Sequence, residues 1–435
     1  MRAVRVLWLT ENYYPARGGM AESCDRIVAN LRASGVTIDL LHFARHLHAP
    51  RIETRQGGRH IAFPLGDDPE HGLNGVWNLL EADPLSAEYT HVVAFGGVMP
   101  LLAGPLFAAW LGAALVTLFR GNDFDTGIFS SRRSDIVRFA IECSACVCAV
   151  SREKERRIAA LYPDVRTVWI PNGIDGAEWE ALPSDRARAD AWRAEHVEPG
   201  RRVLGMIGQI KLKKGGPFLI DALLTSGHAD RFHLLFVGDV DAATSTMLAT
   251  HRDALHVTHH PFADRYELVA RYLACDIVVI PSFYDGLPNV LLESAALAVP
   301  FIASTAGGMG DLLQDGRHGY LFHPGDSHGF RAAIARAASA SREELRAMGE
   351  ACAALVHTEY TATRETAAYH DLLASIHPPA SGAPASDAPA SGAPASGAAA
   401  SGALASGAPA SGVPASGAAA GSDVRKPSLI PIGDE

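Results

Sequence analysis

Short apolar runs alternate with amphipathic stretches along most of this 435-residue chain, and this alternation limits the folds that the chain can adopt. The runs are followed by polar or glycine-bearing loops, which is typical of strands that end at one edge of a sheet. Alternating strands and helices build βαβ units, in which helices cover both faces of a parallel sheet. In the first part of the chain the expected strands are residues 4–9, 38–43, 91–95, 113–119, 146–150 and 167–170, with a helix over 27–33.

A second series of apolar runs begins after residue 202, so we expect two sheets. A single hydrophobic core stops growing at roughly 250–300 residues, and this chain is longer. We therefore predict an α/β fold of two doubly wound, Rossmann-like domains facing across a cleft, at residues 1–180 and 203–355, with a linker or surface helix at 181–202. The strands expected in the second domain are residues 203–207, 233–237, 255–259, 276–280, 300–303 and 320–322.

The end of the chain has a different composition. Residues 380–419 repeat, with small variations, a five-residue unit of Ala, Ser, Gly, Ala and Pro. Small residues with recurring Gly and Pro bury too little apolar surface to offset the entropy lost on ordering. We expect residues 377–435 to form a disordered tail.

Charge and cysteine content exclude some classes of protein. A net charge of −10 argues against a general nucleic-acid binder, which needs a basic face. Six cysteines are too few for a disulfide scaffold in a chain of this length, and a reducing cytoplasm fits best. Cys143, Cys146 and Cys148 could be metal ligands, but no second cluster accompanies them, and we interpret them as small buried residues. The apolar run at residues 4–9 is too short for a signal sequence, so export is not expected.

One segment, residues 98–119, has no charged residue and is long enough to cross a bilayer. Pro100, Gly104, Pro105 and Gly112 interrupt it, however. A short helix followed by a buried parallel strand is therefore the favoured interpretation, with a membrane span as the alternative.

The most informative segment follows the expected strand 276–280 and extends from Asp285 to Glu293. Pro288 is a favourable first residue of a helix, whose free N–H groups would bind phosphate or hydroxyl groups. Glu293 would then lie on the second turn, and Asp285 before the helix, so the two carboxylates could face one ligand from different sides. A capped helix with a solvated Glu is the alternative. The order of Gly, Leu, Pro and an Ala-rich helix between and after the two acids favours a binding site.

At these residues the chain resembles the retaining glycosyltransferases of the GT-B fold, specifically the family four group, in which two Glu residues are separated by seven positions. Here Asp285 replaces the first Glu. The resemblance implies that Asp285 contacts the hydroxyls of the donor sugar and that Glu293 holds the ribose of the nucleotide. Gly286, Leu287 and Pro288 would line the same donor site. The Asp side chain is one methylene shorter than Glu, which we expect to affect the choice of donor sugar rather than the activity.

Two further segments match the family. In the segment from Gly208 to Gly215, Gln209 replaces an Arg of the family, and Lys214 occupies the position of a lysine that neutralises the donor diphosphate. Lys211 or Lys213 could supply the missing charge. Gly18 and Gly19 match a glycine pair beside the diphosphate, where the absence of a side chain permits close backbone approach.

The match extends over residues 4–373. Arg120 stands where many relatives have a histidine facing the reacting sugar, and the resemblance makes it a candidate catalytic residue. Residues 172–175 match a loop at the domain junction, and residues 307–311 match a second turn beside the donor. Residues 356–376 resemble the family's closing helix, which returns to the first domain.

Two Asp-x-Asp triplets, Asp123 with Asp125 and Asp239 with Asp241, could in principle bind a divalent metal with substrate phosphates. We interpret them as chance or local structure, because the rest of the chain resembles a metal-independent architecture. No cofactor is therefore expected. The glycine clusters also lack a Gly-x-Gly-x-x-Gly context, which argues against a dinucleotide dehydrogenase.

The expected reaction is transfer of a sugar from a UDP- or GDP-linked donor to a hydroxyl acceptor, such as a glycan, a lipid-linked sugar or a small molecule. A nucleotide-sugar epimerase and a non-catalytic nucleotide-sugar-binding protein are the alternatives. The expected location is the cytoplasm. Peripheral contact with the inner face of a membrane stays open, although no long basic amphipathic helix supports it.

Overall fold

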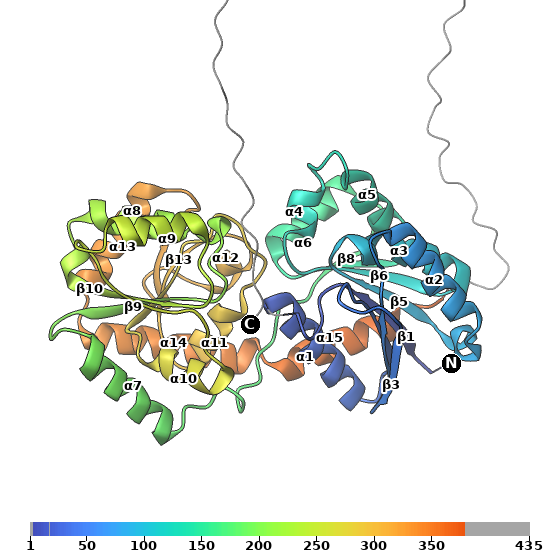
Figure 1. Ribbon diagram of the computed structural model, residues 1–435, viewed down its shortest axis with the longest axis horizontal. Coiled ribbons are helices and arrows are strands. Elements are labelled where there is room, and N and C mark those ends of the chain that lie inside the picture. Colours follow the sequence, from blue (N-terminus) through green and yellow to red (C-terminus); the bar gives the residue numbers. More distant parts are fainter. Residues whose placement is uncertain (1–2, 17, 379–435) are drawn as a thin grey trace, which may run out of the picture. The chain divides into compact units, whose positions relative to one another are not determined.

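The computed structural model describes residues 3–16 and 18–378, which form two α/β domains, each built on one mainly parallel sheet (Figure 1). This confirms the fold predicted from the alternation of strands and helices. The predicted disordered tail, residues 377–435, lies outside the described residues, except for residues 377 and 378.

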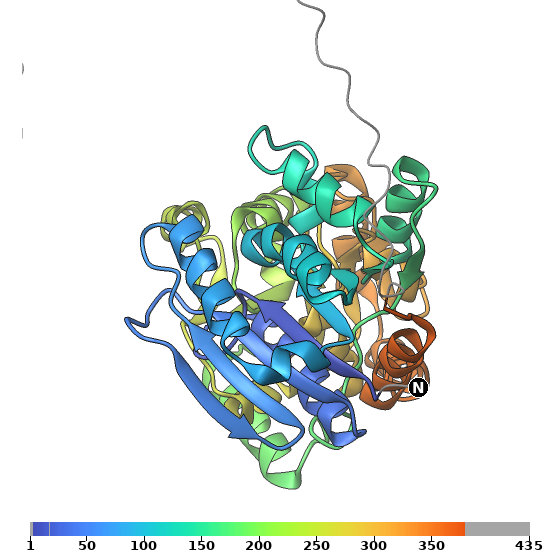
Figure 2. The same ribbon diagram turned by 90° about the vertical axis from the view of Figure 1, so that its right-hand side faces the viewer.

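The first sheet has eight strands in the order β3-β4-β2-β1-β5-β6-β7-β8, all parallel except β3 against β4 (Figure 2). Every strand expected in this domain is present, with ends within one or two residues of the prediction. The strands are β1 (Arg5–Thr10), β2 (Thr37–Phe43), β3 (Arg51–Arg55), β4 (Gly58–Phe63), β5 (His91–Phe95), β6 (Ala114–Phe119), β7 (Cys146–Ala149) and β8 (Thr167–Trp169).

Helices cover both faces of this sheet, because neighbouring residues of each strand point to opposite sides. Val6 and Trp8 of β1 pack against α1 and α15, whereas Leu7 and Leu9 pack against α2 and α3. The helices from this part of the chain are α1 (Gly19–Ala33), α2 (Pro69–Glu81), α3 (Val98–Leu111), α4 (Asp123–Gly127), α5 (Ser134–Glu142), α6 (Arg152–Leu161) and α7 (Pro183–His196), with a 3-10 turn, η1 (Pro84–Glu88).

The uncharged segment considered as a membrane span divides into α3 and the buried strand β6, as the favoured interpretation predicted. Gly112 ends the helix in the left-handed conformation, at a φ of 62°. In the part of the chain that the structure describes, no helix has the length and apolar character needed to span a membrane.

The second sheet has six parallel strands in the order β11-β10-β9-β12-β13-β14. All six were expected from the sequence. They are β9 (Arg202–Ile207), β10 (Phe232–Val237), β11 (His256–His260), β12 (Ile277–Ile280), β13 (Phe301–Ser304) and β14 (Gly319–Phe322).

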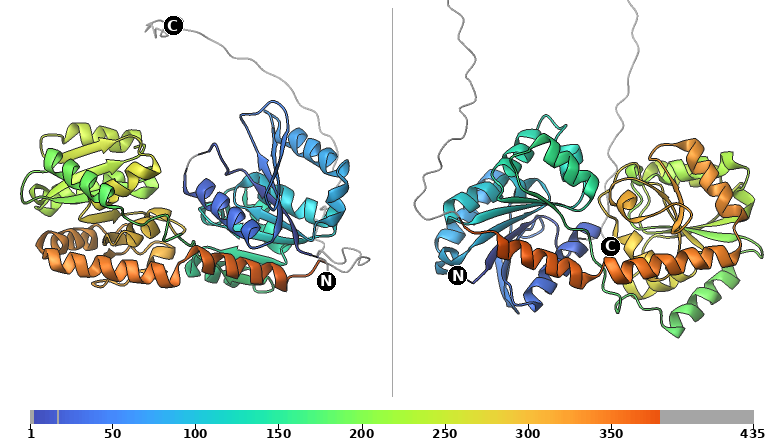
Figure 3. Two further views of the ribbon diagram at one scale, coloured as in Figure 1. Left: turned by 90° about the horizontal axis from the view of Figure 1, so that it is seen from below. Right: turned by 180° about the vertical axis from the view of Figure 1, so that it is seen from behind.

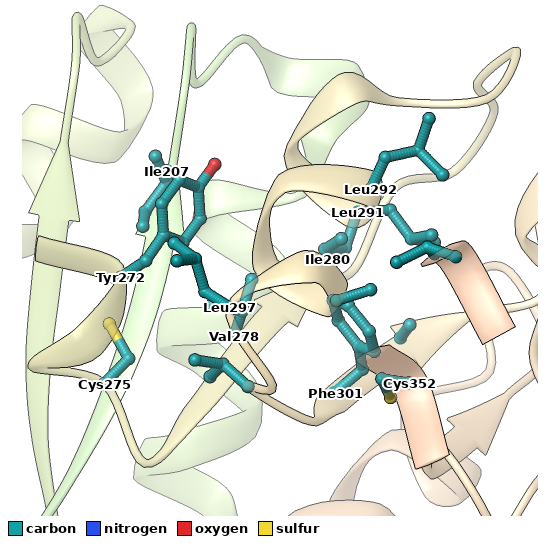
Figure 4. Close-up of a cluster of buried hydrophobic side chains, with 14 of the residues drawn as sticks. Ile207, Tyr272, Cys275, Val278, Ile280, Leu291, Leu292, Leu297, Phe301 and Cys352 are labelled. Carbon is teal, nitrogen blue, oxygen red and sulfur yellow. The ribbon is translucent and has the colours of Figure 1, made fainter. Parts of the chain in front are cut away.

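Two apolar cores enclose the second sheet. One lies between the sheet and α8 and α13, and the other lies against α10, α11 and α14. Figure 4 shows part of the second core, with Tyr272 beside Ile207 and with Leu291 and Leu292 contributed by α11. The helices are α8 (Gly216–Ser226), α9 (Ala242–Thr250), α10 (Arg265–Leu273), α11 (Asn289–Ala296), α12 (Gly308–Leu312), α13 (Ser327–Ser339) and α14 (Arg342–Glu359), with 3-10 turns η2 (Leu212–Lys214) and η3 (Ala229–Arg231).

The last helix, α15 (Ala362–Ser375), follows α14 directly (Figure 3). Its apolar side chains, including Tyr369, Leu372 and Leu373, belong to the core of the first domain. At the junction of the two helices, Ile174 N donates to Tyr360 O (2.8 Å) and Ala362 N donates to Ile174 O (2.9 Å). The segment after β8 is therefore tied to the start of α15.

Both sheets reverse their strand order at one point, between β1 and β5 in the first and between β9 and β12 in the second. In doubly wound sheets, ligands bind outside the carboxyl ends of strands at such a reversal. The connection from β1 into α1 carries Gly18 and Gly19, the connection from β9 to α8 carries Gln209 and Lys214, and the loop after β12 carries Asp285. The topology thus puts the residues suggested by the sequence at the ends of the strands that flank the two reversals.

Candidate functional site

The loop after β12, residues 281–288, is fixed by hydrogen bonds from both sides and is called the acidic loop below. Phe283 N donates to Lys213 O at 2.9 Å. On the other side, Ser304 Oγ donates to Ser282 O at 2.6 Å, and Gly308 N donates to Gly286 O at 2.6 Å. The loop therefore has a defined backbone conformation.

Two glycines permit this packing. Gly307 has a φ of 54°, and a Cβ there would lie 2.1 Å from Asp285 O. Gly215 has a φ of 79°, and a Cβ there would lie 2.5 Å from Pro281 O. Any side chain at either position would displace the acidic loop. These contacts give residues 307–308, which the resemblance assigned to the donor side, a packing role against that loop.

Asp285 and Lys214 form an ion pair at the centre of the site. The Lys214 ammonium donates to Asp285 Oδ2, and Gly286 N donates to Oδ1 at 2.9 Å. The side chains of Asp285 and Lys214 are 12% and 26% exposed. Burial acts to raise the pKa of Asp285, but Lys214, Lys213 and the Gly286 N–H outweigh it, and the pKa is lowered. Asp285 is therefore an ionised hydrogen-bond acceptor over the neutral range.

More positive charge lies beside this pair. Lys213 Nζ lies 5.7 Å from the centre of the Tyr284 ring, and its pKa is lowered by burial, despite the nearby charge of Asp285. Lys214 closes the turn η2, in which Lys214 N donates to Lys211 O at 2.7 Å. Three lysines are thus carried on one short turn next to the acidic loop.

Helix α11 starts one residue later than the sequence suggested. Pro288 has a φ of −68° but a ψ of 134°, so it is the N-cap, and Asn289 is the first helical residue. The correction follows from ψ: proline fixes only φ, and a residue with an extended ψ precedes the first helical residue. Glu293 lies on the second turn, as predicted.

Glu293 is buried in the apolar core beneath α11, and the hydroxyl of Tyr272 donates to its Oε2 at 2.6 Å. Burial raises the pKa of Glu293 to about 7; Glu22 adds to the rise, whereas Tyr272 and Arg26 oppose it. The alternative of a solvated Glu on a capped helix is therefore wrong. Neither Tyr272 nor its pairing with Glu293 was found from the sequence, because α10 and α11 meet only in the tertiary fold.

The glycine pair of the first domain lies against the second. A Cβ on Gly18 would lie 3.6 Å from Gln209 Oε1, and a Cβ on Gly19 would lie 3.5 Å from Asn289 Nδ2. Asn289 Nδ2 also donates to Gly19 O at 3.4 Å. The structure thus brings the loops after β1 and β9 together with the start of α11. In the described part of the chain the Gln209 side chain forms no hydrogen bond.

Arg120 has a different environment from the one that the resemblance implies. Its side chain is only 1% exposed, and its Nη2 donates to Glu365 Oε1 on α15 at 3.0 Å. Its Nη1 donates to Tyr369 Oη at 2.6 Å and to Ile170 O at 3.0 Å. The buried carboxylate of Glu365 holds the guanidinium toward α15, and the catalytic role that the resemblance implies for Arg120 stays a prediction. Only the backbone of Arg120 reaches the acidic loop: a Cβ on Gly286 would lie 2.4 Å from Arg120 O.

The Asp-x-Asp triplets have local partners. Asp125 pairs with Lys154, and Asp123 accepts from Gly121 N at 2.9 Å. Asp241 caps α9 by accepting from Thr244 N at 2.8 Å. Within residues 3–16 and 18–378, no group of three or more His, Cys, Asp or Glu side chains is arranged to hold a metal ion.

The cysteines are free thiols, and Cys146 and Cys148 are buried, as predicted. Cys143 is exposed, so its predicted burial is wrong. It follows the last residue of α5, where the chain leaves the helix and no element covers it.

Together, the residues at the ends of β1, β9 and β12 form a site with three chemical features. Lysines can neutralise phosphate oxygens, an ionised carboxylate can accept from hydroxyls, and the N-terminus of α11 offers free N–H groups. Glu293 adds a second carboxylate that can change its protonation near neutral pH. Such a site suits a ligand that carries both phosphate and several hydroxyl groups.

Comparison with known families matches both domains. Residues 18–173 match the family model described as "Glycosyl transferase 4-like domain", and residues 201–340 match the model described as "Glycosyl transferases group 1". The second match covers Gln209, Lys214, Asp285 and Glu293.

Among characterised relatives, the chain is 26% identical over 363 residues to alpha-maltose-1-phosphate synthase of Mycolicibacterium smegmatis, covering 77% of this chain and 89% of that protein. It is 30% identical over 193 residues to D-inositol 3-phosphate glycosyltransferase of Segniliparus rotundus, covering 42% of this chain and 41% of that protein.

Solved structures show the same fold. Sucrose-phosphate synthase of Thermosynechococcus elongatus superposes with a TM-score of 0.70 at 19% identity, covering 86% of this chain and all of that one. HepE of Anabaena, solved in complex with UDP and glucose, superposes with a TM-score of 0.66 at 18% identity and with the same coverage.

Proposed function

The protein is a glycosyltransferase with the GT-B fold, and from this premise we propose that it transfers a sugar from a UDP- or GDP-linked donor to a hydroxyl acceptor with retention of anomeric configuration. The observation that carries the proposal is the Lys214–Asp285 pair beside the N-terminus of α11. The reaction breaks the bond between a sugar and a phosphate. A cation can bind the phosphate, and an ionised carboxylate next to it can bind the hydroxyl groups of the sugar.

In this proposal Lys214 binds the diphosphate. Negative charge grows on the diphosphate as the bond to the sugar breaks, and a fixed cation stabilises that charge more in the transition state than in the ground state. Lys211 and Lys213 lie on the same turn and add to the positive potential, which takes over the role of the arginine that Gln209 replaces. HepE of Anabaena, which shares the fold, was solved with UDP-glucose, and this supports a nucleoside diphosphate sugar as the donor.

Asp285 would hold the sugar through its hydroxyl groups. Its carboxylate is ionised and already accepts from the Gly286 N–H on one oxygen, while the other faces Lys214. A sugar hydroxyl that donates to Asp285 while Lys214 turns toward the phosphate would keep both charges paired. The donor would thus bind between Lys214 and Asp285, which pair with each other when no donor is bound.

Glu293 would accept hydrogen bonds from the ribose hydroxyls of the nucleotide. Tyr272 occupies one oxygen of its carboxylate, which leaves the other for a ligand. Because the pKa of Glu293 is about 7, the ionised form that accepts best is present in only part of the molecules at neutral pH. Ribose binding would then favour loss of the proton.

The first domain would supply the acceptor side. Gly18 and Gly19 lie beside Gln209 and Asn289, and the acceptor hydroxyl would enter next to the loop after β1. We propose no side-chain general base: the departing phosphate takes the proton of the acceptor as the new bond forms on the same face. Exclusion of water by the contacting loops would limit hydrolysis of the donor.

The reaction would need no resident cofactor or metal ion, since Lys214 and its neighbours supply the charge that a metal provides in other enzymes. We place it in the cytoplasm, because six cysteines are too few for a disulfide scaffold in a chain of this length. The acceptor would be a glycan, a lipid-linked sugar or a small molecule, and a lipid-linked acceptor would bring the enzyme to the inner membrane surface.

Incubation of the purified protein with labelled UDP- and GDP-sugars and a panel of hydroxyl acceptors tests the proposal. Label in a new glycoside whose anomeric configuration, measured by NMR, matches that of the donor is the expected result, with equal rates in EDTA. Label confined to a nucleotide sugar would indicate an epimerase instead. Nucleotide binding without turnover over the whole panel would indicate a non-catalytic binding protein.

A further inference from the structure

A buried network of charged residues connects α15 to the acidic loop through Asn172. Glu365, on the first turn of α15, accepts from Arg120 and also from Arg26 Nε at 3.1 Å. Arg120 in turn donates to Asn172 Oδ1. Asn172 Nδ2 then donates to Leu287 O in the acidic loop at 2.6 Å.

The chemistry of these groups fixes the orientation of the Asn172 amide. A guanidinium can only donate, so the amide oxygen must face Arg120. The amide nitrogen must then face Leu287 O, which can only accept. Arg120, Asn172 and Glu365 are each no more than 5% exposed, so water cannot replace any of these partners freely.

Asn172 also reaches the start of α11. Its Nδ2 lies 3.3 Å from Asn289 Oδ1, which accepts from Ser23 Oγ at 3.4 Å. Asn289 itself contacts Gly19 through its other amide atom. One side chain therefore contacts both the acidic loop and the helix N-terminus that follow β12.

We propose that Arg120 and Asn172 are positioning residues for the donor site: Arg120, held by Glu365, orients Asn172, whose amide nitrogen fixes the acidic loop through Leu287 O. This inference rests on the proposed function and adds to it a link between the last helix and donor binding. It also gives Arg120 a role that requires no contact with substrate.

A second buried network has nearly the same composition and provides a matched control. Asp39 accepts from Arg5 at 2.9 Å, from Arg59 at 2.8 Å and from the Tyr89 hydroxyl at 2.7 Å. Each network thus has one buried carboxylate, two arginines and a tyrosine. The Asp39 network lies between β1, β2, β4 and the segment before β5, and within the described residues none of its side chains bonds to the acidic loop.

The isosteric variant Asn172→Asp separates positioning from stability. Asp keeps an oxygen for Arg120 to bind but has no N–H for Leu287 O. We expect calorimetric affinity for UDP, or for GDP if that is the nucleotide bound, to fall about tenfold, which is the effect of losing one buried hydrogen bond. Arg120→Lys should lower the affinity by a similar factor. The double variant should bind the nucleotide about as tightly as either single variant, because both substitutions disrupt the same chain of hydrogen bonds.

Two controls complete the experiment. Tyr369→Phe removes a hydroxyl that contacts Arg120 but not Asn172, and Arg5→Lys weakens the Asp39 network. Both should keep nucleotide affinity within about twofold, even if their melting temperatures fall by a few degrees. Wild-type affinity in Asn172→Asp, or an equal loss in Tyr369→Phe, would overturn the inference.

Hydrogen exchange of the unliganded protein tests the inference independently of the proposed function. Amides of residues 285–287 and 289–291 should exchange faster in Asn172→Asp than in the wild type, and at the wild-type rate in Arg5→Lys. Unchanged exchange in Asn172→Asp would contradict the positioning role. If the wild-type protein binds neither nucleotide but the exchange pattern is as expected, the proposed function fails while the positioning role stands.

Discussion

Asp285 and Glu293 lie on one short segment and are both shielded from water, yet their protonation differs. Asp285 faces the Lys214 ammonium and a backbone N–H, and its pKa is lowered. Glu293 has one close hydrogen-bond donor, the neutral hydroxyl of Tyr272, and its pKa is raised to about 7. Burial pushes both pKa values upward, so the difference comes from the neighbours that the fold supplies.

The comparison separates the two roles in the proposed site. A carboxylate that is ionised at every relevant pH suits a permanent acceptor for sugar hydroxyls. A carboxylate that gains or loses a proton near neutral pH makes binding and stability depend on pH. Variants that exchange the surroundings or the chemistry of the two acids test this distinction.

Removal of Lys214 should have the largest effect. In Lys214→Met, Asp285 loses its nearest opposing charge and keeps the weaker effect of Lys213, so the pKa of Asp285 should rise. Loss of the cation at the diphosphate should lower kcat by about 10²–10³-fold, the range found when one stabilising donor is removed from an active site. Steady-state rates with the labelled donor measure this.

Lys214→Arg provides the control, because it restores the charge and should recover much of the rate. If Lys214→Met kept more than about a tenth of wild-type kcat, the lysine would not be the diphosphate contact.

The raised pKa of Glu293 predicts a pH-dependent loss of stability. In the unfolded chain Glu has its ordinary pKa near 4.5, so the native state binds more protons than the unfolded state between about pH 4.5 and 7. Stability from this group is therefore complete below about pH 4.5 and lost as pH rises to about 7. Replacing Glu293 by Gln should remove the loss, which is on the order of 3 kcal/mol by pH 8.

Urea unfolding of the wild type and Glu293→Gln at pH 5, 6, 7 and 8 measures this difference. The gap between the two free energies of unfolding should shift in favour of the variant as pH rises. Parallel curves would mean that Glu293 titrates with an ordinary pKa.

Nucleotide binding should show the opposite pH dependence. If ribose hydroxyls donate to ionised Glu293, wild-type affinity for the nucleoside diphosphate should increase as pH rises through about 7. In Glu293→Gln the affinity should be about tenfold lower at pH 8 and should lose that component of the pH dependence. Calorimetry in two buffers of different ionisation enthalpy should show more proton release on binding in the wild type than in Glu293→Gln. Equal affinities at pH 8 would show that Glu293 does not contact the nucleotide.

Much of this arrangement could be predicted from the sequence. Strands that are buried on both faces have continuous apolar sequences. All strands of the second sheet and most strands of the first sheet were therefore predicted at nearly their observed positions. The hairpin of β3 and β4 was missed. Every residue of β3 is exposed, and Ile52 is its one apolar residue, so the segment has no apolar pattern.

The site was predicted less completely. Motif spacing placed Asp285 and Glu293 in one region, because both follow the same strand. It could not supply Tyr272 or the exact environment of Arg120, since these depend on which helix packs where. The Arg120 side chain is long and binds a buried carboxylate within its reach. That carboxylate belongs to Glu365, which lies 245 positions later in the chain, so the sequence gives no sign of the pairing.

The smallest effect should come from Asp285→Glu, which keeps the charge and restores the acid typical of the resembling family. One added methylene moves the carboxylate outward from Lys214 and toward the sugar, so it should change which donor is preferred more than the rate. We expect the ratio of kcat/KM for two donor sugars to change by about two- to tenfold, the range associated with a single methylene in a pocket. Competition between two labelled donors measures this ratio directly.

Because Glu293 retains its surroundings in this variant, the pH dependence of nucleotide affinity should stay that of the wild type. A changed pH dependence would show that the protonation of Glu293 depends on the residue at position 285. The two carboxylates could then not be assigned separate roles.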